Sequence, residues 1–535
     1  MHQLGLFENE EKKLLTIKEA SIWASEYLKR KITVSNISYL IQYGRITKYQ
    51  KNGKIFIHLD ELKNYYDTIN NEELSTKNKK SDINWHLSFI QYKESERTKH
   101  VHRLHPYKGK FIPQLVEYFL DTHTDKFKKK VYFKKGDIVL DPFCGSGTTL
   151  VQANELGIHA IGIDISIFNV LISNVKVKKH DLFKISEQID YLTFKLNEFQ
   201  KDKVYIQFED ELTLELNKFN NQYFPSPEYR KKVTMGLIEE EKYSIEKETK
   251  FLNKYWELVN KYKIKIKQDR DQSFLDLWFL DTVRKEIDFL ANKINNLESD
   301  DDTKNVLKLI LSRTARSCRA TTHADLATLK KPVITTYYCK KHSKICKPIF
   351  SIKKWWEYYT KDTLKRLAEF DKIRTNTYQI AIAGDSRNID IYEELKKINQ
   401  ELAELIKDQK IRGIFSSPPY VGLIDYHEQH AYAYEIFNLE RRDELEIGPL
   451  FKGQGEAQRK SYVQGISEVL KNCKKYLQPD YDIFLVANDK FNLYPEIAEL
   501  AGMRIVNKFN RPVLNRVEKD RENLFTESIF HLKEK

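Results

Sequence analysis

The chain has 535 residues, of which 41% are hydrophobic and 31% are charged, and its formal net charge is +13. This balance excludes a disordered chain, and the length predicts two to four domains. The five cysteines are irregularly spaced, which excludes a secreted disulfide scaffold. The sequence shows no signal segment and no apolar run long enough for a membrane span, so we expect a cytoplasmic protein. The spread of Lys and Arg fits a polyanionic partner, or equally the Lys-rich surface of a protein from an AT-rich genome.

The sequence pattern of residues 14–66 predicts a small domain that contains helices and one pair of strands. Thr16 is placed to cap the first helix, and the second helix, VSNISYLIQY, ends at Gly44. Two short strands follow, joined at Asn52-Gly53, a dipeptide typical of a tight hairpin turn. Asp60 is placed to cap a last helix.

This order resembles the winged helix-turn-helix of the excisionase and MerR-like group. The resemblance implies that residues 35–43 form a recognition helix, that Ser35, Ser38 and Tyr39 contact DNA, and that Asn52-Gly53 is the tip of the wing. A small helical scaffold that contacts only protein is the alternative, because the pattern is permissive.

Polar residues without periodicity between 68 and 85 indicate a linker. Helices and strands alternate from about 100 to 180 and from about 378 to the end, which predicts an α/β domain with a mostly parallel sheet. Lys/Glu-rich helical runs lie between these halves. We therefore divide the chain into a helix-turn-helix domain (1–70), a linker (71–85), a first core half (86–180), a helical insert (181–375) and a second core half (376–535).

The stretch IVLDPFCGSGTT is the most informative one. Ile138–Leu140 predicts a buried strand, with Asp141 at its carboxyl end and a glycine-rich turn that leads into a helix. Glycines at this edge of a sheet let the backbone approach a ligand closely. The next strand, HAIGIDIS, ends in Asp164, and a carboxylate there can accept both hydroxyls of a ribose.

The longer form Asp-Pro-Phe-x-Gly-x-Gly-Thr-Thr resembles the methyl-donor loop of the amino-methylating DNA methyltransferases. The resemblance implies a Rossmann-like class I core that binds S-adenosylmethionine, with Asp164 on the ribose, Asp141 near the methionine part, and Asp385-Ser386 beside the adenine. It also implies that residues 105–113 close over the methionine end of the cofactor. The alternative for this segment is an ordinary helix start with a Phe that packs in the core. The implied cofactor-binding residues are Lys110, Phe111, Pro113, Asp141, Pro142, Phe143, Gly145, Gly147, Thr148, Thr149, Asp164, Ile165, Asp385 and Ser386.

GIFSSPPYVG predicts a strand that enters the tetrapeptide Ser417-Pro418-Pro419-Tyr420, which we expect to be catalytic. Two consecutive prolines cannot continue a sheet, so the backbone turns stiffly at the end of the strand. An exocyclic amino group is a poor nucleophile, and two acceptors that pull on its hydrogens raise its reactivity. The Ser417 side chain and the Pro418 carbonyl can supply these acceptors while Tyr420 stacks on a flipped-out base. A proline-stiffened loop is the alternative.

The first residue of this tetrapeptide bears on the target base. Ser there resembles the cytosine-N4 enzymes, whereas Asp or Asn is the usual adenine-N6 form. No cysteine follows a proline, which disfavours the thiolate mechanism of C5 methylation. Asp425, Tyr426 and His430 then lie on a loop and helix that we expect to face the target.

The favoured function is therefore a site-specific DNA methyltransferase that acts on the N4 of cytosine in double-stranded DNA. The setting is restriction-modification or defence, with a cognate restriction endonuclease as a candidate partner. The alternatives are adenine-N6 methylation, methylation of RNA amino groups, and a DNA-binding regulator with an inactive methyltransferase core.

The insert falls between the second and third predicted strands, a departure from the usual arrangement in this family. Within it, Arg313, Arg316 and Arg319 lie near aromatic residues in the sequence, a composition suited to DNA contacts or to a solvated surface.

Cys339, His342 and Cys346 have the short spacing of zinc ligands, and Cys318 or His323 is available as a fourth ligand. The sequence lacks a second tight pair, so packed, reduced thiols are favoured and we predict no metal site.

Overall fold

The computed structural model describes residues 14–28, 32–42, 46–51, 54–67, 83–107, 109–125, 127–323, 325, 329–513 and 525–535. These residues form two compact units. The core unit comprises the described residues among 82–201, 268–319 and 351–535, and the second unit comprises those among 1–81, 202–267 and 320–350. The predicted insert is thus shared between the two units. Within the described ranges, every helix is too short or too polar to cross a bilayer.

The core unit is built on a sheet whose strands follow the order β11-β12-β10-β9-β4-β5-β8. Neighbouring strands from β10 to β8 are parallel, whereas β12 is antiparallel to both of its neighbours. The predicted mostly parallel α/β sheet is therefore confirmed. The strands are β4 (Ile138–Asp141), β5 (His159–Asp164), β8 (Gln379–Ala383), β9 (Ile411–Ser416), β10 (Leu477–Ala487), β11 (Met503–Pro512) and β12 (Thr526–Glu534).

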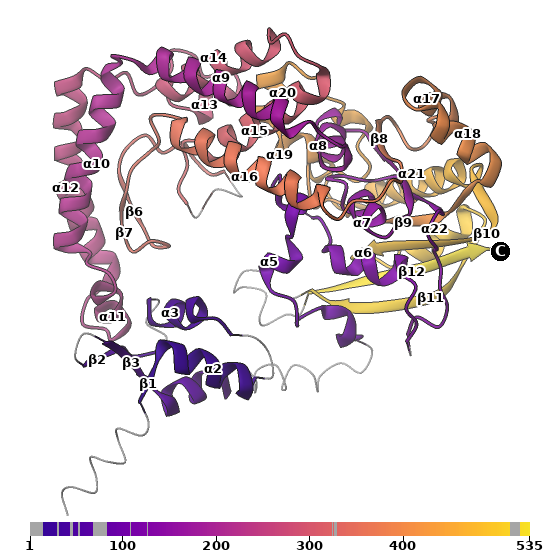
Figure 1. The fold of residues 1–535 in the computed structure, drawn as a ribbon, viewed down its shortest axis with the longest axis horizontal. Coiled ribbons are helices and arrows are strands. Elements are labelled where there is room, and N and C mark those ends of the chain that lie inside the picture. The colour runs from indigo at the N-terminus through magenta and orange to yellow at the C-terminus, as the bar shows by residue number, and fades with distance from the viewer. Residues whose placement is uncertain are drawn as a thin grey trace, which may run out of the picture. The chain divides into compact units, whose positions relative to one another are not determined.

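Helices cover both faces of this sheet (Figure 1). Because side chains alternate along a strand, Ile161, Ile163 and Ile483 pack toward α17, α18, α21 and α22. On the other face the Phe119 ring of α6 lies 4.7 Å from the Phe484 ring. The covering helices are α6 (Pro113–Leu120), α7 (Thr148–Glu155), α8 (Ile167–Val177), α17 (Ile391–Ile398), α18 (Gln400–Gln409), α21 (Glu456–Lys474) and α22 (Tyr494–Leu500).

The order of the strands creates a crevice. The chain runs from β4 to β5 and β8 on one side, and then returns to β9 on the other side of β4. Such a reversal leaves space outside the carboxyl ends of the strands, where open α/β sheets bind ligands. Leu140 of β4 pairs with Ile414 of β9, so the glycine loop and the double-proline turn leave the sheet at the same edge.

The segment between β5 and β8 contributes helices to both units. In the core unit, the buried Glu286 carboxylate accepts the Gln200 side-chain amide and the Ile352 backbone amide, each at 2.7 Å. The inserted helices of this unit are α9 (Leu182–Gln200), α13 (Phe274–Trp278), α14 (Asp281–Asn295), α15 (Asp301–Ser317) and α16 (Lys353–Asp371). Its shorter helices are η1 (Trp85–Ser88), α5 (Glu94–Arg97), η2 (His100–Arg103), α19 (Tyr426–Gln429), α20 (Ala431–Phe437), η3 (Asp443–Leu445) and η4 (Leu450–Lys452).

In the second unit, two long helices pack side by side and carry a hairpin (Figure 1). They are α10 (Val204–Tyr223) and α12 (Glu240–Tyr262), with α11 (Glu228–Thr234) between them in the chain. The hairpin consists of β6 (Tyr337–Cys339) and β7 (Lys344–Cys346), which pair antiparallel.

The N-terminal part of this unit has its own small core. Its elements are β1 (Leu14–Thr16), α2 (Ile17–Tyr27), α3 (Val34–Gln42), β2 (Tyr49–Lys51), β3 (Lys54–His58) and a helix over residues 59–67. Thr16 caps α2 as predicted, because its hydroxyl accepts the Glu19 amide. The pairing of β1 with β3 was not predicted. Asp60 lies inside the last helix rather than before it, and Gly44 and Asn52-Gly53 lie outside the described residues.

Candidate active site

Two glycines shape the loop between β4 and α7. Gly145 has a φ of 49° and Gly147 a φ of 72°, a region that residues with a Cβ rarely adopt. A Cβ on Gly145 would lie 3.0 Å from the Tyr107 hydroxyl, and one on Gly147 would lie 2.8 Å from the Ser173 hydroxyl. Both positions therefore require glycine if the loop is to keep this course.

Asp164, at the end of β5, holds this loop in place. Its carboxylate accepts the Gly145 amide at 2.8 Å, the Ser166 amide at 2.9 Å and the Asn169 side-chain amide at 3.0 Å. Burial raises the pKa of this carboxyl, and the three hydrogen bonds oppose that rise. Because a carboxylate offers about four lone-pair positions, Asp164 keeps acceptor capacity for a ligand.

The residues after β8 are tied to the same loop. The Ser386 hydroxyl donates to the Pro142 carbonyl at 2.7 Å, and the Asp385 carboxylate pairs with the Arg387 guanidinium at 2.6 Å. The ends of β4, β5 and β8 are thus joined by polar contacts.

Asp141 joins the glycine loop to the end of β9, directly before the double-proline turn. Its buried carboxylate accepts the Ser416 hydroxyl at 2.6 Å and the Phe143 amide at 3.2 Å. Burial is the main cause that raises the pKa of Asp141 to about 6. Thr149 makes a second link, because its hydroxyl donates to the Phe415 carbonyl at 3.3 Å.

In the tetrapeptide after β9, Ser417 and Tyr420 have different surroundings. The Ser417 hydroxyl donates to the Val486 carbonyl at 3.0 Å, so its proton is engaged and its lone pairs remain. The Tyr420 hydroxyl donates to the Glu527 carboxylate at 2.9 Å. Burial and this carboxylate raise the pKa of Tyr420, and its ring packs against the sheet core.

A pocket opens at this edge of the sheet, with about 840 Å³ of empty space when the open solvent at its mouth is included. Its wall brings together the glycine loop, the ends of β5 and β8, and the double-proline turn. The predicted residues that line it are Lys110, Phe111, Pro142, Phe143, Gly145, Thr148, Asp164, Ile165, Asp385, Ser386, Ser417 and Pro419. The predicted residues that are not part of its lining are Pro113, Asp141, Gly147, Thr149, Pro418 and Tyr420.

The segment before α6 forms one side of the pocket. The Phe111 ring lies 5.5 Å from the Phe415 ring, edge to face. The Lys110 ammonium donates to the His102 carbonyl at 2.7 Å, and burial lowers the pKa of this lysine to about 8. Pro113 begins α6, so it sets the direction of this helix.

The lining also includes residues outside the predicted cofactor and catalytic sets, among them Tyr107, Asn169, Glu446 and Tyr426, the last of which was expected on the target-facing loop. Tyr107 lies in the same short segment as Lys110, and the Asn169 amide donates to the Tyr107 hydroxyl at 3.2 Å. The Tyr107 and Tyr426 rings stack with centroids 6.2 Å apart. The closeness of Tyr107 to Phe111 in the sequence could have identified it, whereas Glu446 lies far from every motif.

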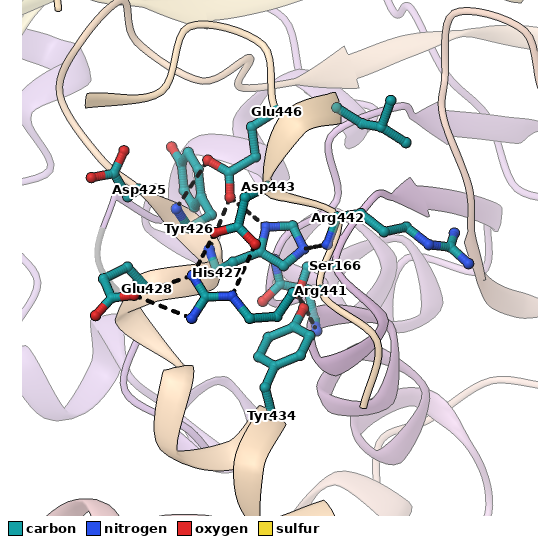
Figure 2. A network of polar contacts seen from close by, with 12 residues as sticks. Ser166, Asp425, Tyr426, His427, Glu428, Tyr434, Arg441, Arg442, Asp443 and Glu446 are labelled. Carbon is teal, nitrogen blue, oxygen red and sulfur yellow. Dashed lines mark hydrogen bonds and ion pairs between the residues drawn. The ribbon is translucent and has the colours of Figure 1, made fainter. Parts of the chain in front are cut away.

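Figure 2 shows the network that fixes Glu446. Its carboxylate accepts the backbone amide of His427 at 2.9 Å and also bonds the His427 Nδ1. The Arg442 amide donates to the His427 Nε2 at 3.3 Å, so the imidazole proton is on Nδ1 and is donated to Glu446. Arg441 bridges the neighbouring carboxylates of Glu428 and Asp443. The loop after the double-proline turn is thereby held against the pocket.

His430 is buried, contrary to the expectation that it faces the target. Its ring lies 5.2 Å from both the His105 and Phe168 rings, and burial lowers its pKa to about 3. A side chain in this position is not available to a macromolecular ligand.

The three arginines predicted to contact DNA differ in exposure. Arg313 is buried, donates to the Thr363 hydroxyl at 2.6 Å and pairs with Asp362, so this geometry gives its predicted DNA contact no support. Arg319 is buried against the Tyr432 ring, 5.7 Å away. Arg316 is half-buried.

The predicted recognition residues Ser35, Ser38 and Tyr39 all lie on α3. Ser38 is half-buried. The side chains of Ser35 and Tyr39 lie outside the described part of the structure.

Comparison with known proteins identifies the family. A DNA methylase family model matches residues 5–175. The chain is 48% identical over 531 residues to the type II methyltransferase M.MjaII of Methanocaldococcus jannaschii, a match that covers 98% of this chain and 97% of that protein. Shorter matches include M.MvaI of Kocuria varians, 33% identical over 118 residues (22% of this chain, 24% of that protein), and M.BsoBI of Geobacillus stearothermophilus, 38% identical over 72 residues (14% and 13%). The chain therefore belongs to the type II DNA methyltransferases of the amino-methylating family.

Proposed function

We propose that this protein transfers a methyl group from S-adenosylmethionine to the N4 of cytosine in double-stranded DNA. The observation that carries the proposal is that the glycine loop after β4 and the Ser-Pro-Pro-Tyr turn after β9 contribute to one pocket. Since β4 and β9 are parallel neighbours, a donor and an acceptor held by these two loops can meet. The strand order also fits a Rossmann-like class I methyltransferase core.

The pocket suits the proposed cofactor in its donor set. Asp164 would accept the ribose hydroxyls, Asp385 and Ser386 would border the adenine, and Lys110 and Phe111 would close over the methionine end. S-adenosylmethionine, when bound, supplies a methyl group carried on a positively charged sulfur.

The turn after β9 supplies the acceptors for the amino group. Because the Ser417 proton is donated to the Val486 carbonyl, the Ser417 oxygen presents lone pairs to an incoming N–H. The Pro418 carbonyl is the second acceptor. These two bonds would pull the amino hydrogens away from the ring plane and raise the nucleophilicity of the nitrogen. Pro419 lines the pocket beside Ser417. Tyr420 was expected to stack on the base, but its ring packs against the sheet core and is not part of the pocket lining, so this geometry gives the stacking role no support.

Action on duplex DNA requires that the base leave the helix, because the amino group is otherwise paired. The net charge of +13 suits a DNA partner, and α3 of the N-terminal part is the proposed recognition helix. A cytoplasmic protein of a restriction-modification system, with a cognate endonuclease, is the setting we propose.

The test uses purified protein, duplex DNA and S-adenosylmethionine, followed by digestion to nucleosides and mass spectrometry. We expect N4-methyldeoxycytidine, and Ser417→Ala should lower the rate of its formation by about 1,000-fold. Exclusive formation of N6-methyldeoxyadenosine would replace the cytosine assignment by the adenine alternative. Binding of DNA without any modified nucleoside would favour the inactive regulator.

A further inference from the structure

A cluster of two cysteines and two histidines lies on the β6–β7 hairpin, separate from the residues of the active-site pocket. Cys339 ends β6, Cys346 ends β7, His342 lies in the connecting turn, and His323 comes from the preceding segment. Their four ligand-type atoms all lie within 4.8 Å of one another. Such a set matches the composition of structural zinc sites.

The separations within the cluster agree with a single tetrahedral ion. Zinc lies about 2.3 Å from sulfur and about 2.0–2.1 Å from nitrogen, so a sulfur and a nitrogen on one ion are about 3.6 Å apart. The Cys339 sulfur lies 3.8 Å from the His323 Nδ1, and the Cys346 sulfur lies 3.5 Å from the His342 Nδ1. The two imidazole rings have centroids 4.3 Å apart. Each thiol therefore faces an imidazole nitrogen, which distinguishes the cluster from thiols packed in apolar surroundings.

The backbone holds these ligands in position. The Cys339 carbonyl accepts the His342 amide at 3.0 Å and the Ser343 amide at 2.7 Å, which folds the turn back on β6. The Asn220 side chain of α10 donates to the Ile345 carbonyl and accepts the Ile345 amide, each at 3.0 Å. The hairpin is thus fixed to α10 by contacts that leave the cysteine side chains to the cluster.

The exposure of the four side chains allows an ion to enter, and their number fits a structural zinc ion. The two cysteines are buried and the two histidines are exposed, so the ion can enter from solvent. Four protein ligands leave no open coordination position, which is typical of structural rather than catalytic zinc. The Tyr337 hydroxyl lies 2.8 Å from the His323 Nδ1, so a metal bound through this atom competes with that hydrogen bond.

We propose that His323, Cys339, His342 and Cys346 bind one zinc ion that crosslinks the β6–β7 hairpin to the segment before it. His323 is sixteen residues from Cys339, which is why the short spacing in the sequence does not reveal a complete ligand set. The zinc site is independent of the base that the enzyme methylates.

The test measures metal content and coordination in the full-length protein. We expect one equivalent of zinc per chain by plasma mass spectrometry. After exchange with cobalt, we expect the visible absorption of tetrahedral cobalt and a sulfur-to-cobalt charge-transfer band. Cys339→Ser and Cys346→Ser should each weaken zinc binding by at least about 100-fold, because a ligand is lost outright.

The controls separate loss of the ligand from loss of the fold. Cys318→Ala and Cys473→Ala remove buried thiols outside the cluster and should retain one zinc. His323→Ala changes an exposed side chain and should weaken zinc binding while S-adenosylmethionine still binds. Tyr337→Phe removes the competing hydroxyl and should bind zinc at least as tightly as the unaltered protein.

Three outcomes would overturn the proposal. They are a chain that stays free of zinc after incubation with excess zinc, full zinc content in the Cys339→Ser/Cys346→Ser double variant, or a disulfide between these two cysteines in protein isolated under reducing conditions.

Discussion

The active-site pocket and the Cys/His cluster are held together by different means. The pocket lies at the edge of a sheet whose central strands β9, β4 and β5 each have two parallel neighbours, and the backbone positions of Gly145 and Ser417 follow from that sheet. The cluster gathers around a hairpin of two three-residue strands, which is only marginally stable by itself and is fixed to α10 through Asn220. A sheet can hold a site in place before a ligand arrives, whereas a short hairpin depends on added crosslinks.

The largest expected effect tests the pocket. Ser417→Ala removes an acceptor proposed for the amino group, and we expect methyl transfer to fall by about 1,000-fold, as for the loss of one transition-state hydrogen bond. The dissociation constant of S-adenosylmethionine should change little. Single-turnover transfer and calorimetric titration measure the two quantities. Ser461→Ala, an exposed serine on α21, is the matched control, and equal activity of both variants would exclude the role of Ser417.

Asp164→Ala tests the other side of the pocket. The change removes the proposed acceptor for the ribose and three hydrogen bonds, one of which comes from Gly145 of the glycine loop, so we expect S-adenosylmethionine to bind about 100-fold more weakly. Zinc content should be unaffected, because this residue is not part of the cluster. Titration calorimetry together with metal analysis checks both statements. Unchanged cofactor affinity would contradict the proposed ribose contact.

Asn220→Ala tests the hairpin. It leaves the buried amide and carbonyl of Ile345 without their side-chain partner, and we expect a local loss of about 2 kcal/mol in the opening free energy of the hairpin. Hydrogen exchange read by mass spectrometry should show faster exchange in β6 and β7 but not in β4 or β9. Asn221→Ala, an exposed neighbour, is the control. Faster exchange in all strands would mean that the hairpin is not an independently stabilised element.

The last prediction concerns pH, and its effect is small within any one pH unit. Because the folded protein raises the pKa of Asp141 from 3.8 to about 6, the folded state binds more protons than the unfolded state between these values. The contribution of Asp141 to the free energy of unfolding is therefore fully present below pH 3.8 and is lost as the pH rises through 6. The free energy of unfolding should fall with a slope of at most about 1.4 kcal/mol per pH unit. Urea unfolding of the parent and of Asp141→Asn at several pH values measures this slope. An identical dependence of the unfolding free energy on pH in both proteins would exclude the raised pKa of Asp141.

The core was predictable because its strands and loops are encoded locally. Each central strand is a short apolar run, and Gly145, Asp164 and Ser417 follow directly after such runs, so strand polarity alone brings their loops to one edge. The contribution of Glu446 was not predictable, since it depends on a tertiary contact with His427. For the same reason the sequence did not indicate that Arg313 is buried against Asp362.

The hairpin shows the same limit of local information. Spacing revealed three of the four clustered side chains, but the position of His323 depends on how the chain approaches β6. Composition likewise suggested that the insert is one domain, whereas α14 and α15 belong to the core unit and α10 and α12 to the second unit. Helical periodicity shows which face of a helix is apolar, and not which partner buries that face.

A crystal structure with duplex DNA and a non-reactive analogue of S-adenosylmethionine would test the central claim most directly. We expect the ribose of the analogue on Asp164 and an extruded cytosine whose amino group is bonded to the Ser417 oxygen and the Pro418 carbonyl. An analogue bound outside the β4–β9 crevice, or a base that remains stacked in the duplex, would contradict the proposed mechanism.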